Sequence, residues 1–280
     1  MRLGKRLRAS VVLLHVVETQ PTLPGAETVG LDRIAPNRAA LAEKQLQTLA
    51  RKEGRGVIKI STLVRSGKPF NEIGIAAAEV IADLIVIATH GHTGIQRAWL
   101  GSTAERVVRH APCPVLTVPA NNPFQTTSNA PPLGLKKILV PIDFSQLSQD
   151  ALPYALQVAA DFNAEITLVH VVQLFPIDRL LGAEMTHQAL IPSIKQAEAD
   201  LQKMAAELRA STGIPTSVSV LTGTPHSALC EAARSLEADL VILTTHGYTG
   251  LNRFWLGSTA ERVIRQAPCP VLAVRGLATT

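Results

Sequence analysis

Residues 89–116 read THGHTGIQRAWLGSTAERVVRHAPCPVL, and residues 245–272 repeat this stretch almost unchanged as THGYTGLNRFWLGSTAERVIRQAPCPVL. From residue 82 to residue 118, roughly seven positions in ten are identical to the second copy. Farther upstream, RASVVLLHVV matches NAEITLVHVV. The chain is therefore a tandem duplication, and the Pro-, Asn- and Thr-rich segment at residues 119–134 is the predicted linker between the copies.

Each copy alternates strand and helix patterns. The predicted strands of the second copy are apolar and rich in β-branched residues, at 136–143, 165–172, 217–223, 239–245 and 270–274. Helical patterns lie between them, at 145–161, 194–211, 227–237 and 258–266. Nearly continuous apolar strands that alternate with helices predict an α/β fold with a parallel sheet covered on both faces. Ligands of such sheets bind beyond the carboxyl ends of the strands.

Composition narrows the classes of function. With 280 residues, 46% apolar and 18% charged, the chain is long and apolar enough for two globular domains. Its apolar runs are too short to span a membrane and its N-terminus lacks a signal-peptide pattern, so we expect a cytoplasmic protein with no membrane partner. The three cysteines have neither disulfide nor metal-site spacing. The net charge of +5 comes from scattered Lys and Arg residues, so we expect no nucleic-acid partner.

The repeated loop lies where a ligand would bind in such a fold. In each copy a strand ends in Thr-His-Gly, nine residues follow, and Gly-Ser-Thr opens a helix, at Gly101 and at Gly257. Glycine allows a ligand to approach the backbone, and N–H groups at a helix start attract anions, so the loop is a candidate phosphate cradle. The alternative is a structural helix cap, with Glu105 and Glu261 completing a capping box. Both interpretations stay open at this point.

The loop and its surroundings resemble a known family. The pattern Gly-x-x-Gly, nine residues and Gly-Ser, with VPIDFS upstream and the PCPVL endings, resembles the universal stress protein family in its tandem form. The resemblance implies two tandem flavodoxin-like (adenine nucleotide alpha hydrolase-like) open parallel sheets with helices on both faces. It also implies a stress-response function and bound ATP, with or without Mg²⁺. One position departs from the pattern, because Thr244 and Ala88 stand where the motif has its first glycine.

The resemblance assigns a nucleotide site in the second domain and a vestigial site in the first. The implied nucleotide-binding residues are Pro141, Asp143, Val171, Thr244, Gly247, Gly257, Ser258 and Thr259. The vestigial site would comprise Val16, Gly91, Gly101, Ser102 and Thr103. In the second domain, the residues after the first two strands would flank the adenine and ribose, and the loop and helix start would hold the ribose and phosphates. Neither set contains an expected catalytic residue or metal ligand.

The resemblance also sets the expected domain limits. Residues 134–276 form a complete domain, whereas residues 1–120 lack the first strand and most of the first helix, so Asp143 has no counterpart there. In the family's strand order, 3-2-1-4-5, the missing strand is the central one. Because a buried unpaired backbone group costs on the order of 1–3 kcal/mol, we expect the natural chain to begin about 35 residues upstream. We also expect about one ATP site per chain and pairing of the two last strands within the chain, with a homodimer as a further option.

Three functions remain open. The first is a nucleotide-binding stress-response protein. The second is a ligand-free interaction or scaffold protein of the same fold, which Thr244 and Ala88 permit. The third is a slow ATP hydrolase, which is disfavoured because the chain has no Walker lysine and no acidic residue beside the loop. His90 and His246 adjoin the loop glycine without a partner at catalytic spacing, so we interpret them as structural and expect at most weak ATP hydrolysis.

Overall fold

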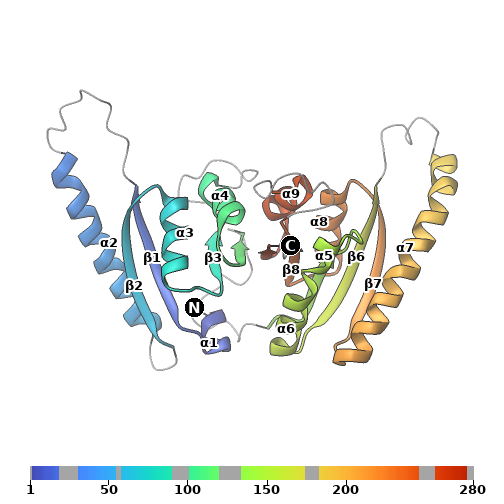
Figure 1. The fold of residues 1–280 in the computed structure, drawn as a ribbon, viewed down its shortest axis with the longest axis horizontal. Helices are drawn as coiled ribbons and strands as arrows, with labels where there is room; N and C mark the ends of the chain where they lie inside the picture. The colour runs from blue at the N-terminus through green and yellow to red at the C-terminus, as the bar shows by residue number, and fades with distance from the viewer. Residues whose placement is uncertain are drawn as a thin grey trace. The chain divides into compact units, whose positions relative to one another are not determined.

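A computed structural model describes residues 2–18, 31–54, 58–89, 101–119, 134–173, 183–245 and 256–275, with the side chains of residues 31–36 and 183–188 excepted. Residues up to Ala82 form one compact unit, and the described residues from Asp83 onward form a second unit (Figure 1). The last two strands of the first repeat belong to the sheet of the second unit. The boundary between the repeats and the boundary between the packed units therefore differ.

The first unit is a parallel two-stranded sheet with a helix on each side. Its elements are α1 (Arg2–Leu7), β1 (Val11–Glu18), α2 (Leu31–Glu53), β2 (Ile60–Gly67) and α3 (Pro69–Glu79). β1 and β2 pair from Val11 opposite Ile60 to Glu18 opposite Gly67. The two longer helices pack against both strands, α2 on one side of the pair and α3 on the other (Figure 1).

The second unit is built on one seven-stranded sheet. Its elements are β3 (Ile85–Ala88), α4 (Ser102–His110), β4 (Val115–Val118), β5 (Lys137–Pro141), α5 (Gln146–Gln149), α6 (Leu152–Phe162), β6 (Glu165–Gln173), α7 (Ala183–Thr212), β7 (Thr216–Gly223), α8 (Pro225–Ser235), β8 (Leu240–Thr244), α9 (Ser258–Gln266) and β9 (Val271–Val274). The strand order is β3-β4-β9-β8-β5-β6-β7. Within the second repeat, β7-β6-β5-β8-β9 are all parallel, which confirms the order 3-2-1-4-5 that the family resemblance implies. None of the described helices is both long and apolar enough to cross a membrane.

The central strands are buried because their sequences are apolar on both faces. All five residues of β8 are buried, and Ile138, Leu139 and Val140 of β5 are at most 1% exposed. β5 and β8 lie side by side and run parallel. Their carboxyl ends, Pro141 and Thr244, therefore reach the same edge of the sheet.

The last strands of the two repeats form an antiparallel pair. Val115 lies opposite Ala273, and Thr117 lies opposite Val271. The Thr117 hydroxyl also donates a hydrogen bond to the Val271 carbonyl at 3.1 Å. Through this pair β4 and β3 of the first repeat continue the sheet of the second. Among the described residues, β3 pairs only with β4 and β1 only with β2, so no strand there takes the position that β5 has in the second repeat.

Candidate functional site

The turn after β5 holds Asp143 at the carboxyl edge of the sheet. Just before it, the Ile142 N–H donates to the Val169 carbonyl of β6 at 2.8 Å. Oδ1 of Asp143 accepts from the Ser145 N–H at 3.0 Å and from the Ser145 hydroxyl at 2.5 Å. The Ser145 oxygen in turn accepts from the Ser148 N–H at 3.1 Å, which caps α5. Since Asp143 is exposed, a carboxylate of fixed orientation faces solvent at this edge.

Phe144 closes this turn in a strained conformation. Its φ angle is 63°, which is rare for a bulky side chain. The Phe144 ring lies 4.6 Å from the His170 ring, centroid to centroid. Nδ1 of His170 donates to the Ile142 carbonyl at 2.7 Å, so the ring pair ties the turn to β6. Backbone strain of this kind clusters at ligand sites, which supports a functional role for the turn.

Three residues were not predicted as site residues from the sequence: Phe144 and Ser145 of the turn, and His170 of β6, which contacts it. A signal existed for Ser145, because serine just before a helical pattern favours an N-cap. No local signal identifies the positive φ of Phe144, since phenylalanine rarely adopts it. The His170 contact depends on the pairing of β5 with β6, which only the fold reveals.

Hydrogen bonds fix the start of α9 directly beyond the end of β8. Thr244 ends the strand and is 9% exposed, and the next residue, Thr245, is 2% exposed. The Thr245 N–H donates to the Val274 carbonyl at 2.9 Å, and its own carbonyl accepts from the Gly257 N–H at 2.8 Å. The start of α9 therefore shares the sheet edge with the turn after β5.

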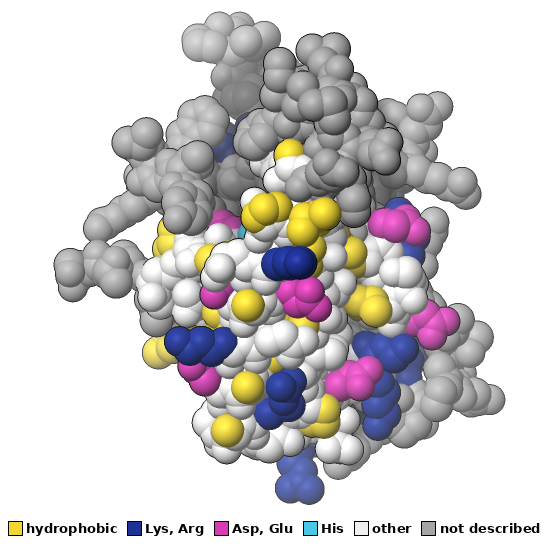
Figure 2. Space-filling view, turned by 90° about the vertical axis from the view of Figure 1, so that its right-hand side faces the viewer, with side chains coloured by type: hydrophobic (Ala, Val, Ile, Leu, Met, Phe, Trp, Pro, Cys, Tyr) yellow, Lys and Arg dark blue, Asp and Glu magenta, His cyan; other side chains and the backbone are white. Residues whose placement is uncertain are grey.

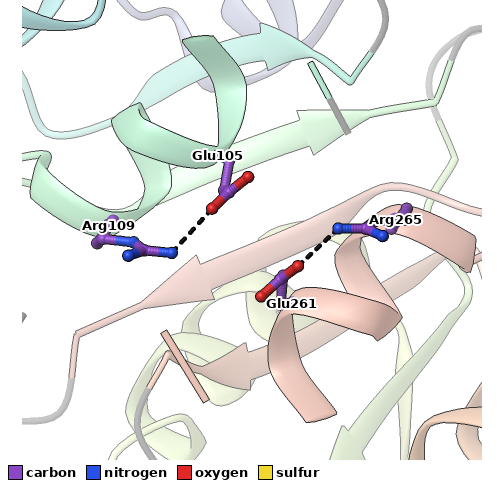
Figure 3. Close-up of polar contacts among 4 residues, drawn as sticks. All are labelled: Glu105, Arg109, Glu261 and Arg265. Carbon is purple, nitrogen blue, oxygen red and sulfur yellow. Dashed lines mark hydrogen bonds and ion pairs between the residues drawn. The ribbon is translucent and has the colours of Figure 1, made fainter. Parts of the chain in front are cut away.

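The capping-box interpretation of the loop is wrong. Gly257 is the N-cap of α9 and has no side-chain capping bond, and its carbonyl accepts from the Glu261 N–H at 2.9 Å. The Glu261 side chain pairs with Arg265 at 2.6 Å, and in the first repeat Glu105 pairs with Arg109 at 2.8 Å (Figure 3). Each glutamate thus reaches one turn forward instead of back to the N-cap. Helix-start N–H groups without a side-chain cap attract an anion.

The backbone angles at the N-cap do not require glycine. Gly101 has φ −57° and ψ 137°, and Gly257 has φ −58° and ψ 137°, a conformation open to most residues. Among the described residues, a Cβ at Gly101 would meet only the Thr89 carbonyl oxygen, at 3.4 Å. Backbone strain therefore does not explain why both repeats have glycine at this position.

The structure brings together most of the second-domain site. The residues at the shared sheet edge are Pro141, Asp143, Thr244, Gly257, Ser258 and Thr259. Val171 lies on β6, two residues beyond the carbonyl that binds Ile142. Gly247 and Gly91 lie outside the described residues. Of the vestigial site, Gly101, Ser102 and Thr103 start α4 in the second unit, whereas Val16 belongs to β1 of the first unit and lines a cavity there.

Other groups that could carry chemistry do not form a rival site among the described residues. Burial raises the pKa of the Cys269 thiol to about 12, and the nearby Asp239 carboxylate and Cys230 add to the effect. Burial also raises the pKa of Cys113 and of Cys230, so all three stay protonated and unreactive near neutral pH. No described cluster of side chains could hold a metal ion. On the face in Figure 2, basic and acidic side chains are interspersed.

Comparison with known proteins identifies the family. The model of the universal stress protein family matches residues 1–119 and 134–275. A universal stress protein of Methanocaldococcus jannaschii is 36% identical over 140 residues, 50% of this chain and 82% of its own length. One of Mycobacterium tuberculosis is 27% identical over 274 residues, 95% of this chain and 87% of its own. The crystal structure of a universal stress protein from Archaeoglobus fulgidus covers 100% of this chain and 93% of its own, with a TM-score of 0.71 and 23% identity. The chain belongs to the universal stress protein family.

Proposed function

We propose that the second domain binds an adenine nucleotide, ATP, and that the chain is a nucleotide-dependent stress-response protein of the cytoplasm. The observation that carries this proposal is the start of α9. Its N-cap is Gly257, no side chain caps it, and it shares the sheet edge with the exposed Asp143 carboxylate. One sheet edge thus offers N–H donors for phosphate and a carboxylate for hydroxyl groups. Open α/β sheets bind ligands at this edge, and the family motif supports the same ligand.

The two sides of the edge have different roles in the proposal. The phosphates lie against the N–H groups of Gly257, Ser258 and Thr259, where the exposed Ser258 hydroxyl adds a donor. Asp143 accepts hydrogen bonds from ribose hydroxyls, and the anchoring of Oδ1 by Ser145 orients its carboxylate beforehand. The half-buried Val171 side chain offers apolar surface to the adenine.

The first domain supplies only the phosphate half of such a site. The Gly101 N–H donates to the Thr89 carbonyl at 2.9 Å. This bond is equivalent to the one from the Gly257 N–H to the Thr245 carbonyl in the second repeat. Among the described residues, however, none takes the position beside β3 that the strand before Asp143 has beside β8. We therefore expect one nucleotide per chain, held by the second domain. Pairing of the two domains through β4 and β9 within one chain is part of the same proposal, supported by their antiparallel register.

Isothermal titration of the nucleotide-free chain with ATP tests the proposal. We expect about one ATP per chain, and binding at least about tenfold weaker for Asp143→Ala, which is about 1.4 kcal/mol. Asp161→Ala is the matched control, because this carboxylate is also exposed but lies on α6, outside the site. Its ATP affinity should equal that of the wild type. Two equivalent sites, or no binding at all, would contradict the proposal.

A ligand-free scaffold protein is the second candidate, and Thr244 favours it. This residue stands at the motif's first glycine, so the position carries a side chain that the motif lacks. Thr244→Gly separates the candidates. Tighter ATP binding by the variant than by the wild type supports a nucleotide-binding protein of reduced affinity. If neither protein binds ATP, the scaffold function replaces the nucleotide-binding one.

A further inference from the structure

Arg262 lies one turn into α9, on the same face of the helix as Ser258. The two residues are four positions apart, and residues at this spacing are neighbours on a helix surface. Helical side chains lean toward the N-terminus, so the Arg262 side chain extends toward the helix start. Within the described residues its guanidinium forms no ion pair, whereas Arg265 of the same helix pairs with Glu261 at 2.6 Å. Arg262 is therefore an exposed cation beside the proposed phosphate site.

His226, at the start of α8, indicates where the charge of Arg262 lies. α8 begins at Pro225, directly after the carboxyl end of β7, and packs against α9. Burial lowers the pKa of His226, and the Arg262 guanidinium lowers it further. Because such an effect requires two charges to be close, the guanidinium lies toward the start of α8. The side chain of Arg262 thus reaches the sheet edge where we propose that the nucleotide binds.

The start of α8 adds hydrogen-bonding side chains next to Arg262. Nε2 of His226 and the exposed Ser227 hydroxyl share a hydrogen bond at 3.2 Å. The first repeat differs here, because the match of SGKPFN with TGTPHS aligns Phe70 with His226. Its arginine, Arg106, is kept at the position of Arg262. The second repeat therefore combines an arginine and a histidine where the first has an arginine and a phenylalanine.

We propose that Arg262 binds the terminal phosphate of the nucleotide, with His226 as a second donor, so that the site selects a triphosphate over a monophosphate. This inference rests on the proposed nucleotide function and assigns the part of the ligand that lies beyond the start of α9. A terminal phosphate carries about −1.5 to −2 charge at pH 7, more than an inner phosphate. The planar guanidinium donates two parallel hydrogen bonds to phosphate oxygens, which suits this group.

Titration with ATP and with AMP tests the assignment, because AMP lacks the outer phosphates. Arg262→Gln removes the charge and keeps a long polar side chain. It should weaken ATP binding at least about tenfold and AMP binding less than about twofold. Arg106→Gln is the matched control, since it makes the same change at the same helix position of the first repeat. Its affinities for ATP and AMP should equal those of the wild type.

Two further variants test the geometry of the contact. Arg262→Lys keeps the charge but loses the planar fork, so it should bind ATP severalfold more weakly than the wild type and more tightly than Arg262→Gln. His226→Phe introduces the side chain that the first repeat has at this position. It should weaken ATP binding severalfold and leave AMP binding unchanged. Equal ATP affinity of Arg262→Lys and Arg262→Gln would contradict a role for the charge.

The pKa of His226 gives a readout that does not require adenosine. Among the described residues, Arg262 is the one charged group that shifts this pKa. In the ligand-free protein, Arg262→Gln should therefore raise the pKa of His226 toward its ordinary value, as measured by NMR. Inorganic tripolyphosphate added to the wild type should raise it as well, because a bound anion offsets the charge of Arg262. The Arg262→Gln variant should respond less to tripolyphosphate.

The outcomes separate this inference from the proposed function. Equal losses of ATP and AMP affinity in Arg262→Gln, or no loss of either, would overturn the role of Arg262 and leave nucleotide binding intact. A wild type that binds neither ATP nor tripolyphosphate would overturn both. A wild type that binds no ATP, but whose His226 pKa rises with tripolyphosphate only when Arg262 is present, would contradict the nucleotide proposal and support Arg262 as a ligand of another polyphosphate.

Discussion

Replacing Ser258 with aspartate distinguishes a phosphate cradle from a purely structural helix start. Ser258 is the first residue of α9, is exposed, and follows an N-cap without a side-chain capping bond. Removing its hydroxyl therefore costs the fold little. A carboxylate in the first turn gains about 0.3–1 kcal/mol from the helix dipole. We expect the free energy of unfolding without ligand to change by less than about 1 kcal/mol.

The same carboxylate would oppose the phosphates of bound ATP. Two unit charges 6 Å apart interact by about 2.8 kcal/mol at an effective dielectric constant of 20. Solvent at the exposed residue 258 reduces this repulsion. We therefore expect a loss of at least about 1.4 kcal/mol, or tenfold weaker ATP binding. Isothermal titration calorimetry measures the affinity, and chemical denaturation measures the stability.

Ser102→Asp is the matched control, because Gly101 and Gly257 have the same N-cap conformation. The two variants should change stability alike, but Ser102→Asp should leave ATP affinity unchanged. If Ser258→Asp binds ATP as tightly as the wild type, the cradle interpretation is refuted. A large loss of stability in both variants would mean that the loop serves the fold.

Three further changes test the turn, the strand register and a buried thiol. Phe144→Gly releases the positive φ but removes the ring contact with β6, so ATP affinity should fall while stability changes by about 1 kcal/mol or less; unchanged affinity would remove the turn from the site. Cysteines at Val115 and Ala273, directly opposite each other, should form a disulfide within a monomer on non-reducing gels, whereas Thr117 paired with Ala273 is out of register and should cross-link less. Burial raises the pKa of Cys269 from 9.0 to about 12, so the unfolded chain ionises first and stability should fall as pH rises from 9 to 12; Cys269→Ala should lack this contribution, and identical urea-denaturation profiles would contradict it.

Strands of the second repeat are predictable because their sequences are almost wholly apolar. The strand expected at 239–245 is β8, Leu240–Thr244, and the one expected at 270–274 is β9, Val271–Val274. Short apolar runs between polar or Pro-containing segments limit both the type and the length of an element. The helix expected at 145–161 is instead divided into α5 and α6. Pro153, which lacks an N–H, lies in the first turn of α6, where a helix tolerates it.

Features that depend on competing contacts were harder to predict. The helix expected at 194–211 is α7, Ala183–Thr212, which begins eleven residues earlier than expected. Pro192 lies inside it, and proline normally breaks a helix, so the sequence favoured a start after Pro192. The capping box failed because the helix begins one residue earlier than the box requires. The N-cap is Gly257, which has no side chain, and Glu261 is the fourth residue after it instead of the third. Glu261 pairs with Arg265 instead.

The helix start that follows the repeated loop has the same geometry in both repeats. The N-cap angles and the hydrogen bond from the N-cap glycine to the strand end are the same in both repeats. Among the described residues, Asp143 and the strained Phe144 lie at this sheet edge in the second repeat. The conformation of this helix start therefore does not depend on that turn. Because the helix start is alike in both repeats, Asp143→Ala tests the difference between them more directly than a change at the helix start.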